Sequence, residues 1–121
     1  MPHKSRFTSG LLNQTAVYWG NPTPNGEGGY SYDAPVEISC RWELRQELIR
    51  DDVGRELRSK ARIFVGQDLD DHGYLYLGDL DDLDSDEQVD PATVTAAFEI
   101  KMKEEVPDIK GARPVRVVWL G

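Results

Sequence analysis

The stretch from Val36 to Leu44 constrains the fold of this chain more than any other. Apolar side chains occupy every second position in it, at Val36, Ile38, Cys40, Trp42 and Leu44. A period of two is the mark of a β-strand with one buried face and one solvated face. The single cysteine is one of these apolar positions, and we expect it to be a small buried hydrophobe rather than a ligand or a disulfide partner.

Turn sequences divide the following residues into further strands. Asp51-Asp52-Val53-Gly54 places a glycine where a hairpin turn needs one, and an Asp-His-Gly turn precedes the apolar residues 74–78. The close spacing of strands and turns predicts an antiparallel meander that closes into a small barrel or sandwich. A helix over residues 44–57 is the alternative, because three leucines lie there among Glu and Arg. The turn at 51–54 favours two longish strands, whose hairpin would project beyond the barrel.

The rest of the chain continues the β pattern. We expect strands at 15–19, 97–103 and 115–120, a Pro- and Gly-rich loop at 21–29 with a tight turn at Asn25-Gly26, and a turn at 106–111. The acidic run 79–87 is typical of a solvated loop, anchored here by its leucines. Asp90 is expected to cap a short helix near 91–97 that begins with Pro91, although a helix over 92–105 is also compatible with the residues there.

The predicted fold class is therefore mainly β: a small antiparallel β-barrel with long loops. Residues 1–10 are polar and are expected to form a flexible N-terminal arm, and residues 11–121 a single domain. The basic start at Met1–Arg6 is followed by Thr8-Ser9-Gly10 instead of an apolar segment, which argues against a secretory signal. No apolar run approaches the roughly 18 residues that a membrane-spanning helix needs.

Charge and motif content exclude several classes of function. The net charge of −8 is opposite to what a phosphate-binding surface requires, although it does not exclude a protein that DNA passes through, because repulsion keeps a conduit from sticking. Gly26–Gly29 lacks the Lys-Ser/Thr ending of a phosphate loop. Asp68, Asp70 and Asp79 match positions one, three and twelve of a calcium loop. His72 at position five and strand-like flanks favour an ordinary Asp/Gly turn there. No residue pattern predicts a catalytic set, a metal site or a cofactor, so we expect no enzyme.

Several segments resemble the head–tail joining proteins of tailed bacteriophages, also called head-completion or stopper proteins. The resemblance extends over nearly the whole chain from residue 12, and its motifs are structural rather than catalytic. The segments that carry it are Leu12–Gly20, the Pro-Gly loop, Pro35–Trp42, Ala61–Val65, Gly73–Gly78 and Val115–Leu120.

This resemblance implies a β-barrel subunit of the virion neck, made in the cytoplasm of the bacterial host. Six or twelve copies would form a ring below the portal and its adaptor. The ring would close the channel on packaged DNA, without sequence-specific or membrane binding, and would dock the tail terminator or tail tube. By position, the family's channel-closing loop corresponds to Arg50, Asp51, Asp52, Val53, Gly54 and Arg55. Contacts to neighbouring rings are expected from the N-terminal arm and from the loop residues Asn21, Pro22, Pro24, Asn25, Gly26, Gly28 and Gly29. The acidic segment 79–87 has no counterpart in this comparison.

Two other functions compete with a stopper. A tail terminator or an adaptor would also form a ring, and an adaptor would be mainly helical. A free-standing oligonucleotide-binding barrel would use exposed aromatic side chains on a basic groove. The aromatic residues available for such a groove are Tyr18, Trp19, Tyr30 and Tyr32.

Overall fold

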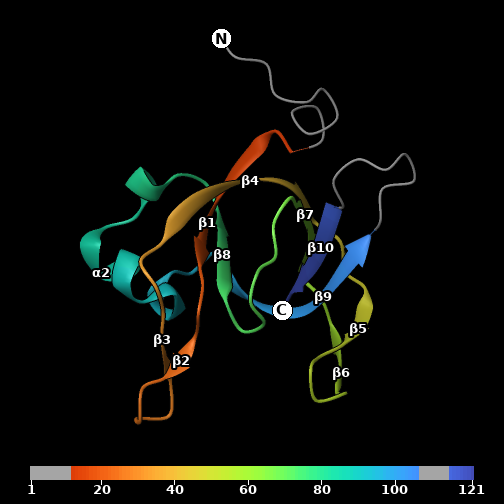
Figure 1. Ribbon diagram of the computed structural model, residues 1–121, viewed down its shortest axis with the longest axis horizontal. Helices are drawn as coiled ribbons and strands as arrows, with labels where there is room; N and C mark the ends of the chain where they lie inside the picture. The colour runs from red at the N-terminus through yellow and green to blue at the C-terminus, as the bar shows by residue number, and fades with distance from the viewer. Residues whose placement is uncertain (1–11, 107–114) are drawn as a thin grey trace.

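The alternating stretch forms strand β4 (Val36–Glu43), and its central side chains follow the expected period: Ile38 and Cys40 are buried, whereas Ser39 between them faces solvent. The expectation of a buried face at Val36 and Leu44 is wrong, because Val36 is 49% exposed at the start of the strand and Leu44 is 87% exposed beyond its end. Cys40 is a free thiol. In the computed structural model, which describes residues 12–106 and 115–121, β4 is one of six strands that close an antiparallel barrel (Figure 1). The predicted mainly β fold is confirmed, whereas the expected arm at 1–10 and turn at 106–111 lie outside the described residues, apart from the strand residue Val106.

The order of strands around the barrel differs from a simple meander. The barrel runs through β1 (Gln14–Trp19), β4, β7 (Ala61–Val65), β10 (Val115–Leu120), β9 (Ala97–Val106) and β8 (Tyr74–Leu77), and returns to β1. The prediction that β8 follows β7 in the sheet is wrong, because β7 pairs with β4 and β10 while β8 pairs with β1 and β9. A turn sequence shows where the chain reverses but not which strand it meets next.

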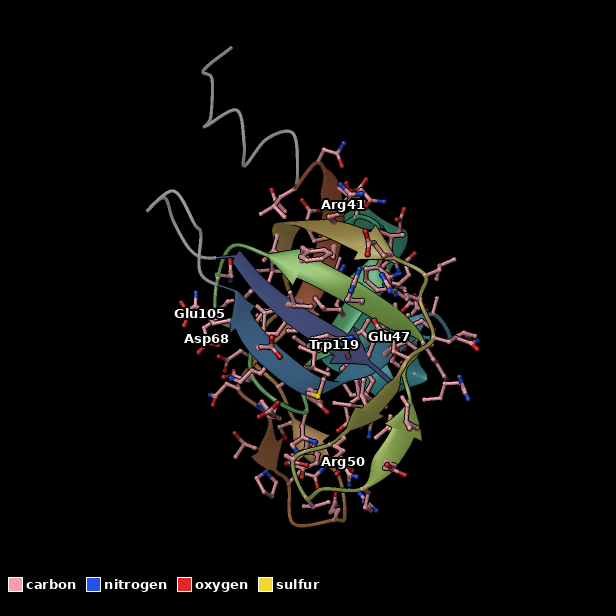
Figure 2. The ribbon with its side chains drawn as sticks, turned by 90° about the vertical axis from the view of Figure 1, so that its right-hand side faces the viewer. Arg41, Glu47, Arg50, Asp68, Glu105 and Trp119 are labelled. Carbon is pink, nitrogen blue, oxygen red and sulfur yellow. The ribbon has the colours of Figure 1, made fainter. Side chains whose placement is uncertain are left out.

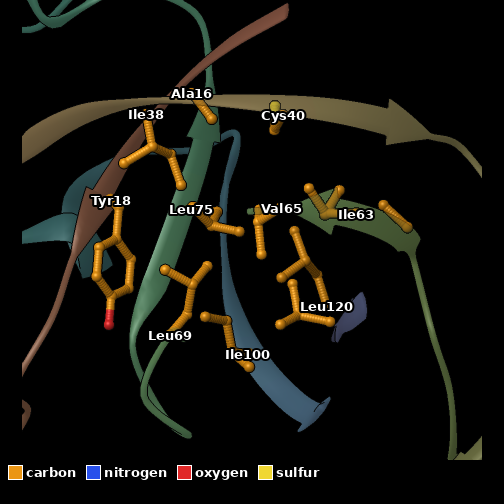
Figure 3. Close-up of a cluster of buried hydrophobic side chains, with 12 residues drawn as sticks. Ala16, Tyr18, Ile38, Cys40, Ile63, Val65, Leu69, Leu75, Ile100 and Leu120 are labelled. Carbon is orange, nitrogen blue, oxygen red and sulfur yellow. The ribbon is translucent and has the colours of Figure 1, made fainter. Parts of the chain in front are cut away.

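The barrel interior is filled by one cluster of apolar side chains, drawn in Figure 3. Leu69, from the connection between β7 and β8, is 1% exposed and belongs to this cluster. Its insertion accounts for the course of that connection, because a buried Leu contributes roughly 1.5–3 kcal/mol. The cluster consists of Ala16, Tyr18, Ile38, Cys40, Ala61, Ile63, Val65, Leu69, Leu75, Ile100, Val118 and Leu120.

The acidic segment covers the outer face of β1. Leu83 and Val94 pack on Val17 and Trp19, so β1 is buried on both faces and the leucine anchor is confirmed. The segment is not only a loop, however. It contains the 3-10 turn η1 (Leu80–Asp82) and the start of a short helix, α2 (Ser85–Val89), which is followed by η2 (Pro91–Thr93).

The helix therefore lies earlier than expected. Asp84 and Glu87 cap α2 reciprocally, each side chain accepting the other residue's backbone N–H. The turn expected at Pro91 is present, with Asp90 as its cap, but it is a single 3-10 turn. Residues 97–106 form β9 rather than a helix.

Residues 44–57 form a hairpin, as predicted, but its arms are shorter than expected. β5 (Leu48–Arg50) and β6 (Glu56–Arg58) have three residues each. The second hairpin joins β2 (Thr23–Pro24) to β3 (Tyr30–Ser31). Figure 1 shows both hairpins extending beyond the same end of the barrel, with α2 and hairpin β5–β6 on opposite sides.

Candidate functional site

The turn of hairpin β5–β6 is organised by one carboxylate. The Asp51 side chain accepts the backbone N–H of Val53 at 3.1 Å and of Arg55 at 2.9 Å, and it also accepts the Arg55 Nε at 3.1 Å. Arg50 donates to the carbonyl of Gly54 at 3.1 Å. The predicted channel-closing loop is thus a defined turn, while Val53 at its tip is 68% exposed. It presents an apolar side chain to solvent on a preformed support.

Gly54 gives this turn a backbone conformation that other residues resist. Its φ is +85°, and a Cβ at this position would meet no atom within 4 Å. We therefore expect Gly54→Ala to cost about 1 kcal/mol through backbone strain alone. Gly54→Asn should cost less, because Asn tolerates positive φ. Urea unfolding of both variants tests this, and equal stabilities of the Ala variant and the wild type would contradict it.

The base of the same hairpin is attached to the barrel by apolar packing. Ile49 is 5% exposed and lies with Leu57 against Val117 and Trp119 on the outer face of β10. Figure 2 shows Trp119 on this face, next to Glu47, which accepts its indole N–H at 3.2 Å. The hairpin is therefore anchored at its base and exposed at its tip.

His72 brings the tip of this hairpin into contact with the barrel. Its Nε2 lies 2.7 Å from Oδ2 of Asp52, and its Nδ1 lies 2.7 Å from Oε2 of Glu99 on β9. The hydrogen bonds to Glu99 and to Asp52 raise the pKa of His72 above its ordinary value, because together they outweigh the partial desolvation that lowers it. Lys101 Nζ lies 2.9 Å from the other oxygen of Glu99.

The second hairpin reaches the same histidine. Tyr30 of β3 stacks on the His72 ring, with centroids 6.2 Å apart and an interplanar angle of 7°. The loop 21–29 was predicted to contact neighbouring rings, and most of it is exposed. Asn25 Oδ1 accepts the N–H groups of Glu27 and Gly29, and Gly26 has a φ of +81°, so the expected turn at Asn25-Gly26 is present.

The candidate ring-contact residues do not form one compact group. Asn21, at the start of the loop, donates its N–H to Asp70 at 2.7 Å and has a φ of 52°. Pro22 precedes β2 and Pro24 is the last residue of that strand, whereas the remaining four residues lie in the loop between β2 and β3. These four residues are Asn25, Gly26, Gly28 and Gly29.

The three aspartates with calcium-like spacing have separate structural roles. Asp68 lies near Lys103 and Arg116, at 3.3 Å and 3.8 Å. Asp70 accepts the hydroxyl of Tyr18 at 3.2 Å, and Asp79 caps η1. Within residues 12–106 and 115–121, no group of three or more His, Cys, Asp or Glu side chains could hold a metal ion.

A shallow hollow of about 340 Å³ lies beside β9 and β10. Its lining carries charges of both signs, and these groups contact one another: Asp68 with Lys103, and Arg116 with both Asp68 and Glu105. Figure 2 places Asp68 and Glu105 together at one edge of the barrel. This arrangement is a surface ion-pair network.

Sequence reasoning located the hairpin tip but missed the residues that hold it. Asp52 and Glu99 lie 20 and 27 positions from His72, so no local pattern connects them. In the part of the chain that the structure describes, no helix is long and apolar enough to cross a membrane. No protein-family model matches this chain, and no curated protein matches it significantly.

Proposed function

We propose that this chain is a head–tail joining protein of a tailed bacteriophage, a stopper whose copies form a closed ring in the virion neck. In this role the ring lies below the portal and its adaptor and docks the tail beneath it. Packaged DNA passes through the lumen without sequence-specific binding. Residues 50–55 of each copy enter the central hole, where ring symmetry brings them together.

The observation that carries this proposal is hairpin β5–β6. A closed barrel has no free strand edges, so copies cannot associate by adding strands to the barrel sheet. The hairpin is an element outside that sheet: it extends beyond the barrel end, its base is buried on β10, and its tip exposes Val53. A gate needs this combination of a fixed base and a solvent-exposed end.

The net charge supports a role beside DNA. It is −8, and a surface of this sign repels phosphates and keeps DNA from adhering. The segment 79–90, with seven acidic residues and no lysine or arginine, lies on the barrel side opposite the hairpin (Figure 1) and so does not line the hole that residues 50–55 would enter.

Two of the competing functions, an adaptor and an oligonucleotide-binding barrel, fit less well. The mainly β fold disfavours an adaptor, which we expected to be helical. An oligonucleotide-binding barrel loses two of its four aromatic side chains, because Tyr18 and Trp19 are buried.

The test is a shortened hairpin. Replacing residues 51–55 by Asn-Gly preserves Ile49 and the Arg50↔Glu56 pair and closes the hairpin with a two-residue turn. We expect necks that assemble on filled heads but fail to retain DNA, measured as nuclease-accessible DNA and as empty heads in electron micrographs. Heads that stay full with the shortened hairpin would refute the assignment.

Hairpin β2–β3 provides a matched control. Replacing residues 25–29 by Asn-Gly again substitutes two residues for five and preserves the Pro24↔Tyr30 pair. The proposal expects this variant to lose attachment of the ring rather than its closure. Necks lacking the protein, rather than leaking necks, are the expected micrographs. Equal leakage from attached rings of both variants would contradict separate roles for the hairpins.

A further inference from the structure

His72 is the point at which two protruding hairpins meet barrel strand β9. It lies in the connection between β7 and β8 and contacts Asp52 from hairpin β5–β6, Glu99 from β9 and the ring of Tyr30 from hairpin β2–β3. Its φ is +69°, a conformation that is uncommon for residues other than glycine. Backbone strain of this kind persists only where surrounding contacts hold it.

The two carboxylates determine the charge that this arrangement needs. An ionised carboxylate only accepts hydrogen bonds, and a neutral imidazole has a single N–H. Because both ring nitrogens of His72 lie 2.7 Å from carboxylate oxygens, both contacts are hydrogen bonds only when the ring is an imidazolium. A neutral ring would place a nitrogen lone pair against an oxygen of Asp52 or Glu99.

Among the residues that the structure describes, no other charged group near the ring takes over the contacts that the His72 protons make with Asp52 and Glu99. On β9, Lys101 contacts the Glu99 oxygen that His72 does not use. On the connection that carries His72, the Asp70 carboxylate is engaged by Tyr18 and Asn21, and Asp71 is the preceding residue. Glu99 and Asp52 are thus the carboxylates that raise the pKa of His72.

Hairpin β5–β6 thus has two attachments of different chemistry. Its base is held by Ile49 on the apolar outer face of β10, and its tip is held by the Asp52 contact to His72. The bonds of Asp51 and Arg50 lie within the hairpin and keep the shape of the turn without tying it to the barrel. Loss of the ionic contact would leave the shape intact and the base anchored.

We propose that Asp52, His72 and Glu99 form a proton-controlled latch that holds the tip of hairpin β5–β6 against the barrel and releases it when His72 loses its proton. The contacts that form the latch all lie within one chain. The inference that the latch controls a channel gate rests on the proposed function. In the neck, the segment that the latch holds is the proposed channel-closing loop. A closed latch would fix this loop against the barrel, and an open latch would leave it free to move.

The direction of the pH dependence follows from the raised pKa of His72. A group whose pKa is higher in the folded state stabilises the fold fully below its unfolded pKa. That contribution is lost as the pH rises through the folded pKa. The latch is therefore closed below the folded-state pKa of His72, which lies above its ordinary value, and it opens as the pH rises through that pKa.

A nitroxide at Val53→Cys reports the state of the tip. Position 53 is exposed, whereas Cys40 is buried and its burial raises the pKa of the thiol to about 11, so labelling is selective. We expect low nitroxide mobility while His72 is protonated and a rise in mobility with the same midpoint as the ring, titrated by NMR in the same sample. Mobility that stays constant while His72 titrates would overturn the latch.

Matched variants separate the latch from general charge effects. Asp52→Asn should abolish the pH step, leave the label mobile throughout and move the His72 midpoint toward its ordinary value. His72→Asn, which suits a positive φ, should do the same to the label. Glu56→Gln removes a carboxylate from the same hairpin, where it pairs with Arg50, and should keep the step. A step that survives in Asp52→Asn, or is lost in Glu56→Gln, would refute the proposal.

These measurements use the free protein and the leakage assay uses virions, so the two proposals fail separately. A pH-independent label together with leaking heads rejects the latch and keeps the gate. A pH-dependent label together with full heads keeps the latch and rejects the gate.

Discussion

Trp19→Ala should lower the free energy of unfolding by about 3–5 kcal/mol, the usual range for removing a buried Trp. Trp19 is the last residue of β1, and its side chain is fully buried under the acidic segment, beside Leu83 and Val94. Its indole Nε1 donates to the carbonyl of Gln88 at 2.8 Å. Gln88 in turn donates its side-chain N–H groups to the carbonyls of Leu80 and Leu83, so the loss affects the whole segment. Urea unfolding followed by circular dichroism measures it.

Two further measurements locate the effect of this substitution. Trp19→Phe preserves most of the apolar contact and removes only the donor, so we expect a loss of about 1 kcal/mol. A protease that cleaves after acidic residues should cut residues 79–90 of the Ala variant faster than those of the wild type, because these acids lose their attachment to β1. Unchanged cleavage would show that Trp19 does not hold the segment.

The elements predicted best are those with one buried face and one solvent-exposed face. β4 has one buried and one solvated face, so its alternating side chains identify it without further information. β1 has both faces buried, the outer one by the acidic segment, so alternation is absent there. Its β-branched and aromatic residues still indicated a strand.

The elements predicted worst depend on contacts between distant parts of the chain. The position of β8 beside β1 follows from the closed strand order and from the insertion of Leu69, neither of which leaves a local pattern. Helix α2 did leave one. Asp84 followed three residues later by Glu87 is a capping-box sequence, and the surrounding acidic run obscured it.

The candidate site divides in the same way. The tip of hairpin β5–β6 could be predicted, because Asp51 and Gly54 are turn residues whose preferences act locally. The attachment of that tip could not be predicted, because Asp52, His72 and Glu99 meet only after the barrel has closed. The apolar base was equally hidden, since Leu48 and Ile49 look alike in the sequence and differ only in the face they occupy.

That difference gives the second large prediction, on two adjacent residues of one strand. Ile49 is 5% exposed on the outer face of β10, whereas Leu48 is 65% exposed. We expect Ile49→Ala to cost about 2–4 kcal/mol, since it leaves a cavity over Val117 and Trp119. Leu48→Ala should stay within about 0.5 kcal/mol of the wild type, as for most surface substitutions. Both are measured by urea unfolding.

The same pair distinguishes a fixed base from a loosely attached hairpin. If the base is the anchor, Ile49→Ala also increases the mobility of a nitroxide at position 53 at a pH where His72 is protonated, because one of the two attachments is lost. Leu48→Ala leaves that mobility unchanged. Equal effects of the two substitutions on stability would mean that β5 does not pack on β10 in solution, and the hairpin would then lack the fixed base that a gate requires.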